Sequence, residues 1–311
     1  MSTRRGWTSI LAPVAGIAAL VLTAAAPADE EVAPLAGYPE GSQVLEGGAV
    51  AVPLKAPSPD WLTPELRQKA SEAAERGMGV DIETGESVLP TAADQFLFIR
   101  PGTWMIAPSW CTMAFVTGSP GSYSITTAGH CFDGASEVIL VTAPSLIFAV
   151  GTGSGHAGDV GNDYGSVKIY PEFQQYVDAD TAVIGGPGPA ASCGSSSVVA
   201  TITNPVPVKH FGHGLVIGTG GTARAGVSTH ANHNDPFIQG GFPNSAIYWS
   251  GAATPGDSGS AVMTAATPEC PLGEALAILT HLVVVGNNGH YIAGTPVSKI
   301  GTAAVGNGLP V

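Results

Sequence analysis

The chain contains little positive charge. It has 11 Lys and Arg residues against 24 Asp and Glu residues among 311, and its formal net charge is -13. After Arg100 only four basic residues remain, namely Lys168, Lys209, Arg224 and Lys299. Nucleic-acid binding requires a cluster of cations that neutralise phosphates. The composition therefore predicts that nucleic acid is not a partner.

The apolar run near the amino terminus is short. It extends from about Ile10 to Leu22, whereas a transmembrane helix needs roughly 20 apolar residues. Arg4 and Arg5 precede the run and Ala26-Pro27-Ala28 follows it, which is typical of a cleaved export signal. We predict a signal peptide over residues 1–28, a secreted, extracellular protein and no stable membrane association. A membrane anchor is the alternative, and the paired arginines leave twin-arginine export open beside ordinary secretion.

Cysteine is scarce as well, and its four positions are Cys111, Cys131, Cys193 and Cys270. In an oxidising compartment, four cysteines favour two disulfides over metal ligands or redox centres. We predict a bridge between Cys111 and Cys131, because it would brace the loop that carries His130. A bridge between Cys193 and Cys270 then follows by elimination.

Long helices are disfavoured by 42 Gly and 25 Pro residues. Residues 29–103 differ from the rest, since 13 of the 24 acidic and five of the 11 basic residues lie in this quarter of the chain and cysteine is absent. Thr63 as N-cap, Pro64 at the first helical position and Gly77 as the stop predict one helix. We interpret residues 29–103 as an N-terminal extension, either a pro-region that assists folding or masks the site, or a flexible linker.

Beyond Trp104, short apolar or alternating runs are separated by turn residues. The predicted strands are 112–116, 123–126, 138–141, 166–170, 198–202, 215–217, 260–263, 277–279 and 282–285. Many strands without helical patterns between them predict an all-β fold. The glycine-rich stretch from Gly185 to Gly194 divides the strands into two halves, and the run from Gly151 to Gly158 is interpreted as a surface connection.

A serine between glycines is the candidate nucleophile. It occurs in Gly256-Asp257-Ser258-Gly259-Ser260. The glycines let the backbone turn sharply, so that the N–H groups of Gly256 and Ser258 can form an oxyanion hole. The alternative is an ordinary surface turn, since Gly, Asp and Ser are common turn residues.

A serine hydroxyl needs a base, and His130 is the candidate. It lies in Thr127-Ala128-Gly129-His130-Cys131, at the end of an apolar run. An imidazole can take up and return a proton near neutral pH. The alternative is a polar turn histidine beside a disulfide, and the occurrence of both motifs in one exported chain weighs against it.

With these two motifs, residues 104–311 resemble the secreted bacterial serine endopeptidases of the chymotrypsin-like family. The resemblance implies two six-stranded antiparallel β-barrels, about 104–190 and 191–311, with the active site in the cleft between them. It also implies an aspartate between the motifs. Asp163, which opens the alternating segment Asp163–Ile169, resembles that acid and would orient His130. Its rivals are Asp159, Asp178 and Asp180.

The order of the three residues along the chain excludes other serine hydrolases. An α/β-hydrolase needs Gly-x-Ser-x-Gly followed by its acid and histidine, but position 260 is serine and no aspartate follows Asp257. In the subtilisin order the acid precedes the histidine. The order His130, Asp163, Ser258 matches the chymotrypsin order.

The resemblance also implies roles for residues around the substrate. Ala252 would lie at the base of the pocket, which excludes pairing with a substrate Lys or Arg, and Thr280 and His281 would form part of its wall. His281 could receive a substrate carboxylate, or the pocket could be apolar. Thr280 would hydrogen-bond to Asp163, and Arg224 would pair with buried Asp257.

We therefore predict a serine endopeptidase that acts on polypeptides through an acyl-enzyme, as a monomer and without cofactor or metal. The histidine pairs His210/His213 and His230/His233 are an alternative metal site, although neither has the glutamate of His-Glu-x-x-His. The alternative function is a catalytically inactive binding or adhesion protein on the same scaffold, since a fold does not guarantee its chemistry.

Overall fold

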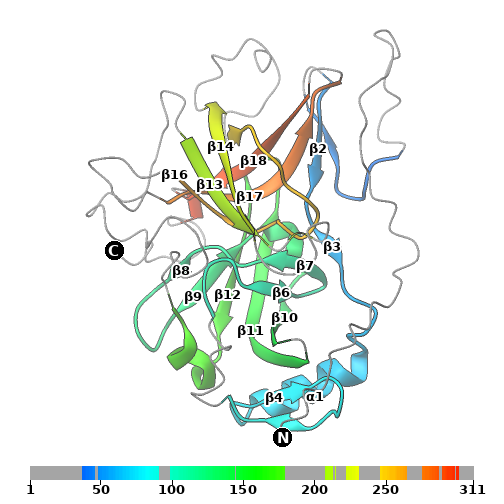
Figure 1. Ribbon diagram of the computed structural model, residues 1–311, viewed down its shortest axis with the longest axis vertical. Helices are drawn as coiled ribbons and strands as arrows, with labels where there is room; N and C mark the ends of the chain where they lie inside the picture. Colours follow the sequence, from blue (N-terminus) through cyan, green and yellow to red (C-terminus); the bar gives the residue numbers. More distant parts are fainter. Residues whose placement is uncertain are drawn as a thin grey trace, which may run out of the picture.

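The structure, a computed structural model, describes residues 37–45, 48–90, 99–143, 145–178, 207–212, 214, 222–230, 246–264, 275–286, 289–297 and 299–300. Over these ranges the chain is mostly β, as predicted. Its strands form two antiparallel sheets, one of eight strands and one of ten. In Figure 1 the eight-stranded sheet occupies the upper half of the molecule and the ten-stranded sheet the lower half.

The eight-stranded sheet contains the strands nearest the candidate serine. Its order is β1 (Gln43–Val44), β2 (Val50–Pro53), β17 (Ala275–Val284), β16 (Ala261–Thr264), β13 (Pro207–Gly212), β14 (Thr222–His230), β15 (Ile247–Trp249) and β18 (His290–Pro296). β18 also pairs with β17. A buried apolar cluster that includes Trp249, Leu279 and Ile292 fills the space against this sheet.

The ten-stranded sheet contains the strands nearest the candidate histidine and aspartate. Its order is β3 (Ala56–Pro57), β7 (Ser109–Thr112), β6 (Trp104–Ile106), β10 (Ser136–Ala143), β11 (Leu146–Ala157), β12 (Asp163–Ile169), β9 (Ser124–Thr127) and β8 (Val116–Thr117). A side branch, β4 (Gly79–Asp81) and β5 (Ser87–Val88), joins it through β11. Two 3₁₀ helices, η1 (Gly129–Cys131) and η2 (Pro171–Tyr176), interrupt the strands.

The strand numbers differ from those of two six-stranded barrels. Residues 43–88 contribute β1 to β5, and without them the eight-stranded sheet keeps six strands and the ten-stranded sheet seven. β1 and β2 extend the eight-stranded sheet through β17, while β3, β4 and β5 belong to the other sheet. The described part of the N-terminal extension is thus paired with both sheets and is not a free linker. Predicted strands 277–279 and 282–285 belong to one strand, β17, and 198–202 and 215–217 lie outside the described residues.

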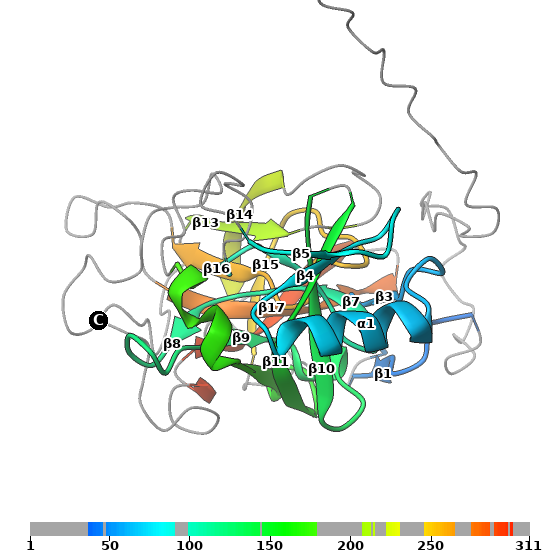
Figure 2. The same ribbon diagram turned by 90° about the horizontal axis from the view of Figure 1, so that it is seen from below.

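The predicted helix is present as α1 (Pro64–Ala74). Thr63 caps it, because its Oγ1 accepts a hydrogen bond from the N–H of Leu66 at 3.2 Å. Ala70, Ala73 and Ala74 form its buried face. The helix packs against β11 and β4, and Figure 2 shows it lying across the lower sheet beside β4 and β5. Small side chains on this face allow the helix to lie close to the strands.

The interpretation of Gly151–Gly158 as a surface connection is wrong, since most of this run lies within β11. Glycines at alternate positions leave one face of the strand without side chains, and the loop that carries His130 packs there. A Cβ atom at Gly155 would lie 2.5 Å from Cα of Gly129, and one at Gly153 would overlap the ring of Phe132. The periodic glycines therefore make room for tertiary packing.

Among the residues that the structure describes, no helix is both long and apolar enough to cross a bilayer. The predicted signal peptide over residues 1–28 lies outside the described residues, as do Cys193 and Cys270.

Candidate active site

The loop that carries His130 is fixed from two sides. η1 follows β9 directly, and the predicted disulfide between Cys111 and Cys131 is confirmed, joining η1 to β7. On the other side, Gly129 lies so close to β11 and β12 that a Cβ atom on it would overlap the backbone oxygen of His156. The His130 side chain is 8 % exposed, so it reaches solvent only at its edge.

Ser258 lies in the tight turn between β15 and β16. Gly256 and Gly259, on either side of it, have φ values of 99° and 89°, a region that glycine adopts without strain. The N–H of Thr112 donates to the carbonyl of Ser258 at 2.7 Å, and its hydroxyl donates to the carbonyl of Gly256 at 2.8 Å. β7 of one sheet therefore holds the serine turn of the other.

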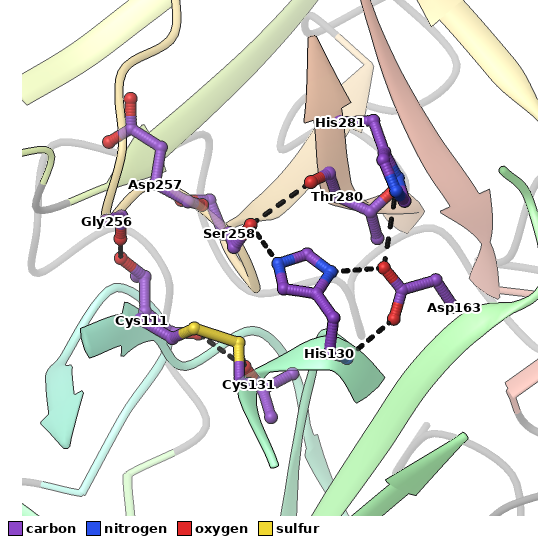
Figure 3. Close-up of a disulfide and its surroundings, with 12 residues drawn as sticks. Cys111, His130, Cys131, Asp163, Gly256, Asp257, Ser258, Thr280 and His281 are labelled. Atoms are coloured by element: carbon purple, nitrogen blue, oxygen red, sulfur yellow. Dashed lines mark hydrogen bonds and ion pairs between the residues drawn. A yellow bond between two sulfur atoms is a disulfide. The ribbon is translucent and has the colours of Figure 1, made fainter. Parts of the chain in front are cut away.

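His130, Asp163 and Ser258 meet across the boundary between the two sheets (Figure 3). Nε2 of His130 lies 2.7 Å from Oγ of Ser258, and Nδ1 of His130 contacts Oδ2 of Asp163. The backbone N–H of His130 donates to Oδ1 of Asp163 at 2.9 Å. Both oxygens of the carboxylate thus bind the histidine residue, which holds the ring plane and favours the tautomer with a proton on Nδ1.

Asp163 is fully buried. Burial alone would raise the pKa of its carboxyl, but the charge attraction of His130 and the hydrogen bonds from its ring and backbone outweigh burial, with a further contribution from His281. The pKa of Asp163 is therefore below its ordinary value. The group is an ionised acceptor at neutral pH, able to stabilise an imidazolium.

Two further residues, Thr295 and Lys299, hold the chain at and just before Asp163, and no sequence motif marks them. Thr295 on β18 donates from its hydroxyl to the carbonyl of Asp163 at 2.7 Å and accepts from the N–H of Asp163 at 3.0 Å. Nζ of Lys299 donates to the carbonyl of Gly161 at 2.9 Å and to Oδ1 of Asn162 at 2.7 Å. No local pattern marks these contacts, since they join residues more than 130 positions apart.

The N–H groups of Gly256 and Ser258 converge on one oxygen, as an oxyanion hole requires. That oxygen is the carbonyl of Leu54, which accepts from Gly256 at 2.6 Å and from Ser258 at 3.3 Å. Nothing in the sequence around Leu54 distinguishes it from the other apolar residues of the extension.

Thr280 and His281 lie on β17 beside the serine. The carbonyl of Thr280 accepts from Oγ of Ser258 at 3.1 Å. The hydroxyl of Thr280 donates to the carbonyl of Ala293 at 3.3 Å and lies 2.9 Å from Nδ1 of His281. These partners are not Asp163, to which the hydroxyl of Thr280 was expected to bond. His281 is 2 % exposed and its Nδ1 lies 3.8 Å from Oδ2 of Asp163.

Buried Asp257 is held by its own turn. Its Oδ2 accepts from the N–H of Thr254 at 2.8 Å and from the hydroxyl of Thr254 at 3.3 Å. Gly212 and Gly214 lie so close to it that Cβ atoms there would overlap this site. Arg224, the predicted cation partner, lies on β14, whose side chains are outside the described part of the structure.

The expected pocket residue Ala252 is exposed, next to Gly251 with a φ of 142°. Its neighbour Ala253 packs against the buried cluster that contains Leu54, as does Leu282. The segment expected to form the base of the pocket therefore packs against the same apolar cluster as Leu54.

Two groups of potential metal ligands occur among the described residues: Cys111, His130 and Cys131, and His130, Asp163 and His281. The two cysteines of the first group are joined in a disulfide, which removes their thiolates. In the second group, Asp163 and His130 already bind each other. Of the predicted alternative, His213 and His233 lie outside the described residues.

No protein-family model and no curated protein matches the chain. Solved structures do match. They include a chymotrypsin of Cellulomonas bogoriensis (21% identity, TM-score 0.39, covering 66% of this chain and 94% of that one). Protease A of Thermobifida fusca matches at 18% identity and TM-score 0.40, with coverage of 66% and 94%. A glutamic-acid-specific serine protease described as using a histidine triad in substrate binding matches at 21% identity and TM-score 0.42, with coverage of 66% and 97%.

About two-thirds of the chain matches bacterial chymotrypsin-like serine proteases. The contacts of His130 with Asp163 and Ser258 within this chain resemble a Ser-His-Asp catalytic triad. Because the sequence identities are low, the roles of individual residues follow from the contacts within this chain.

Lowering the pH from about 6.5 to about 4 will destabilise the protein through His281. Burial lowers the pKa of His281 to about 4, with the nearby charge of Asp163 opposing this and that of His130 adding to it. Since an unfolded histidine titrates near 6.5, the unfolded state binds more protons within this window, and the free energy of unfolding falls as the pH falls. A depression of this size corresponds to ~3 kcal/mol.

Urea unfolding at pH 7, 5 and 4 measures this loss, on a Ser258→Ala background. His281→Gln removes the titrating group and will flatten the pH dependence, whereas His290→Gln, at an exposed position, will keep it. If the free energy of unfolding falls equally with pH in the Ser258→Ala protein and in both of its histidine variants, the assignment to His281 is contradicted.

Proposed function

We propose that the chain is a secreted serine endopeptidase that hydrolyses peptide bonds through a Ser258–His130–Asp163 triad. The observation that carries the proposal is one continuous arrangement: a serine hydroxyl bonded to an imidazole, the imidazole bonded to a buried carboxylate, and two N–H groups converging beside the serine. This arrangement supplies a nucleophile, a base and a site for developing negative charge.

The reaction follows from these contacts. Oγ of Ser258 attacks the carbonyl carbon of the substrate while Nε2 of His130 takes its proton. The N–H groups of Gly256 and Ser258 stabilise the oxyanion, and Asp163 stabilises the imidazolium. His130 then donates the proton to the leaving amine, and the acyl-enzyme forms. Water, activated by His130, repeats the attack, releases the carboxylic acid and restores Ser258.

The substrate class is a polypeptide with an apolar residue before the cleaved bond. Ala253 and Leu282 pack against the apolar cluster that contains Leu54, and Ala252 offers no carboxylate to a substrate Lys or Arg. His281 is uncharged above about pH 4 because burial lowers its pKa to that value, so it supplies no positive charge for a glutamate. An apolar preference is therefore favoured over a glutamate preference.

The organisation that accompanies this function is a signal peptide over residues 1–28, an N-terminal extension over 29–103 and a protease domain over 104–311. The two sheets would correspond to barrels of about 104–190 and 191–311. The enzyme would act as an extracellular monomer and would require neither cofactor nor metal, because the triad supplies every proton transfer.

A fluorophosphonate probe tests the proposal. Incubated secreted protein will gain the mass of one phosphonyl group on the peptide that contains Ser258, and the modified protein will lose peptidase activity. Ser258→Ala will not be labelled. Ser122→Ala, at an exposed turn, will be labelled like the wild type. Absence of labelling in the processed wild type would instead support a catalytically inactive binding protein.

A further inference from the structure

Residues 50–57 cross the candidate active site as two short strands, β2 and β3, joined by Leu54 and Lys55. β2 pairs antiparallel with β17, and Pro53 lies opposite His281. Three residues further on, β3 pairs antiparallel with β7, where Ala56 lies opposite Trp110. Figure 1 shows β2 in the upper sheet and β3 beside β7 in the lower one. The segment Val50–Pro57, which we name the cleft segment, therefore spans from one sheet to the other.

The centre of the cleft segment is bound by the catalytic loop. The carbonyl of Leu54 accepts from both N–H groups of the proposed oxyanion hole, at 2.6 and 3.3 Å. The N–H of Leu54 donates to the carbonyl of Thr280 at 3.0 Å, and that same oxygen accepts from Oγ of Ser258 at 3.1 Å. The serine hydroxyl thus lies beside the peptide unit of Leu54.

The side chains agree with this placement. Leu54 is 2 % exposed and belongs to the apolar cluster of the eight-stranded sheet, against which Ala253 and Leu282 also pack. Sheet pairing stops at Pro53 and resumes at Ala56. The carbonyl of the Leu54–Lys55 bond is therefore held by the serine turn and not by a strand. A peptide bound by strand addition, with one side chain in an apolar pocket, is a general mode of peptide recognition.

We propose that the cleft segment is an internal substrate and that Ser258 cleaves the peptide bond between Leu54 and Lys55. This proposal rests on the proposed function. Oγ of Ser258 would add to the carbonyl carbon of Leu54, and the C–N bond to Lys55 would break as His130 protonates the departing amine. Water then hydrolyses the Leu54 ester, leaving a carboxylate on Leu54 and a free amino group on Lys55.

The position of the Leu54–Lys55 bond determines which strands and helices remain with each of the two cleavage fragments. β3, α1, β4 and β5 follow Lys55 in the chain, so they stay with the protease domain. β1 and β2 precede the bond and are held to the domain by pairing with β17. Their departure would free the edge of β17 and both N–H groups for an external peptide. Cleavage would thus precede activity, and the site would prefer an aliphatic residue such as leucine before the cleaved bond.

Time-resolved mass spectrometry and N-terminal sequencing of the purified full-length chain test this proposal. We expect a new amino terminus at Lys55 and none in Ser258→Ala. The reaction is intramolecular, so its first-order rate constant will not change over a hundredfold range of protein concentration. A synthetic peptide with the sequence of residues 49–58 will be cleaved between leucine and lysine by the processed enzyme.

Two variants test the register. Leu54→Asp places a carboxylate against apolar surface and will slow cleavage at least a hundredfold, while Leu89→Asp, the same change at a residue 60 % exposed, will not. Lys55→Pro keeps Leu54 but makes the leaving nitrogen that of a proline. In this variant the peptide bond between residues 54 and 55 will stay intact. Hydrolysis of an external peptide will then be at least tenfold slower than in the wild type.

The outcomes separate the two proposals. A wild type that is labelled at Ser258 and hydrolyses external peptides while the Leu54–Lys55 bond stays intact would overturn the internal cleavage and leave the proposed function standing. Cleavage at another bond, or equal cleavage in Ser258→Ala, would overturn it as well. Loss of both labelling and peptide hydrolysis in the wild type would refute the proposed function itself.

Discussion

Replacing His130 with alanine will lower kcat for a leucine peptide anilide by about six orders of magnitude. The serine hydroxyl is bonded to Nε2 at 2.7 Å, and without that acceptor it must lose its proton to water while it attacks. Loss of the base in a serine protease triad costs about 10⁶-fold, close to loss of the nucleophile, because the two act as one unit. Turnover will therefore fall close to the detection limit.

The control is His156→Ala, which removes an exposed imidazole from β11 and will retain wild-type turnover. Thermal unfolding and circular dichroism of both variants establish that they are folded. A His130→Ala protein that keeps more than about one per cent of wild-type kcat would contradict the assignment of His130 as the base.

Replacing Asp163 with asparagine will lower kcat by about four orders of magnitude near pH 7. The asparagine side chain has one oxygen and one NH₂ group in place of two oxygens. If its oxygen keeps the bond to the N–H of His130, the NH₂ faces Nδ1, which must then accept. The ring proton moves to Nε2, the nitrogen that has to take the proton of Ser258. A wrong tautomer of this kind costs about 10⁴-fold in a serine protease.

Two measurements distinguish this effect from misfolding. The variant will lose the downfield proton resonance of an Nδ1–H bonded to a carboxylate, and its thermal midpoint will stay within a few degrees of the wild type. Asp159→Asn changes a rival acid that is exposed and will keep full activity. Comparable losses in both variants would show that Asp163 is not the orienting acid.

Several elements of the site were predictable because their signals are local. The glycines around Ser258 have positive φ, and the helix begins at its N-cap, Thr63. Each of these depends on neighbours a few residues away. Cys111 and Cys131 were paired because a bridge between them would brace the loop that carries His130, and the structure confirms this bridge. Asp163 came from resemblance to a family segment and not from local chemistry.

Other features depend on contacts between distant parts of the chain. The glycines of β11 look like a loop in the sequence, yet they admit the ring of Phe132. The sequence around His281 does not indicate that its pKa is lowered, because the lowering comes from burial in the folded protein. Thr295 holds Asp163 from the other sheet. Such environments come from packing, which a linear pattern does not encode.

The sequence by itself determined which side chains could perform the chemistry, since a serine between glycines, a histidine beside a cysteine and an acid between them are readable from residue type and order. Tertiary structure alone decided what lies against them. It placed the carbonyl of Leu54 on the N–H groups of Gly256 and Ser258, because strand pairing by β2 and β3 fixes a register between segments about 200 residues apart.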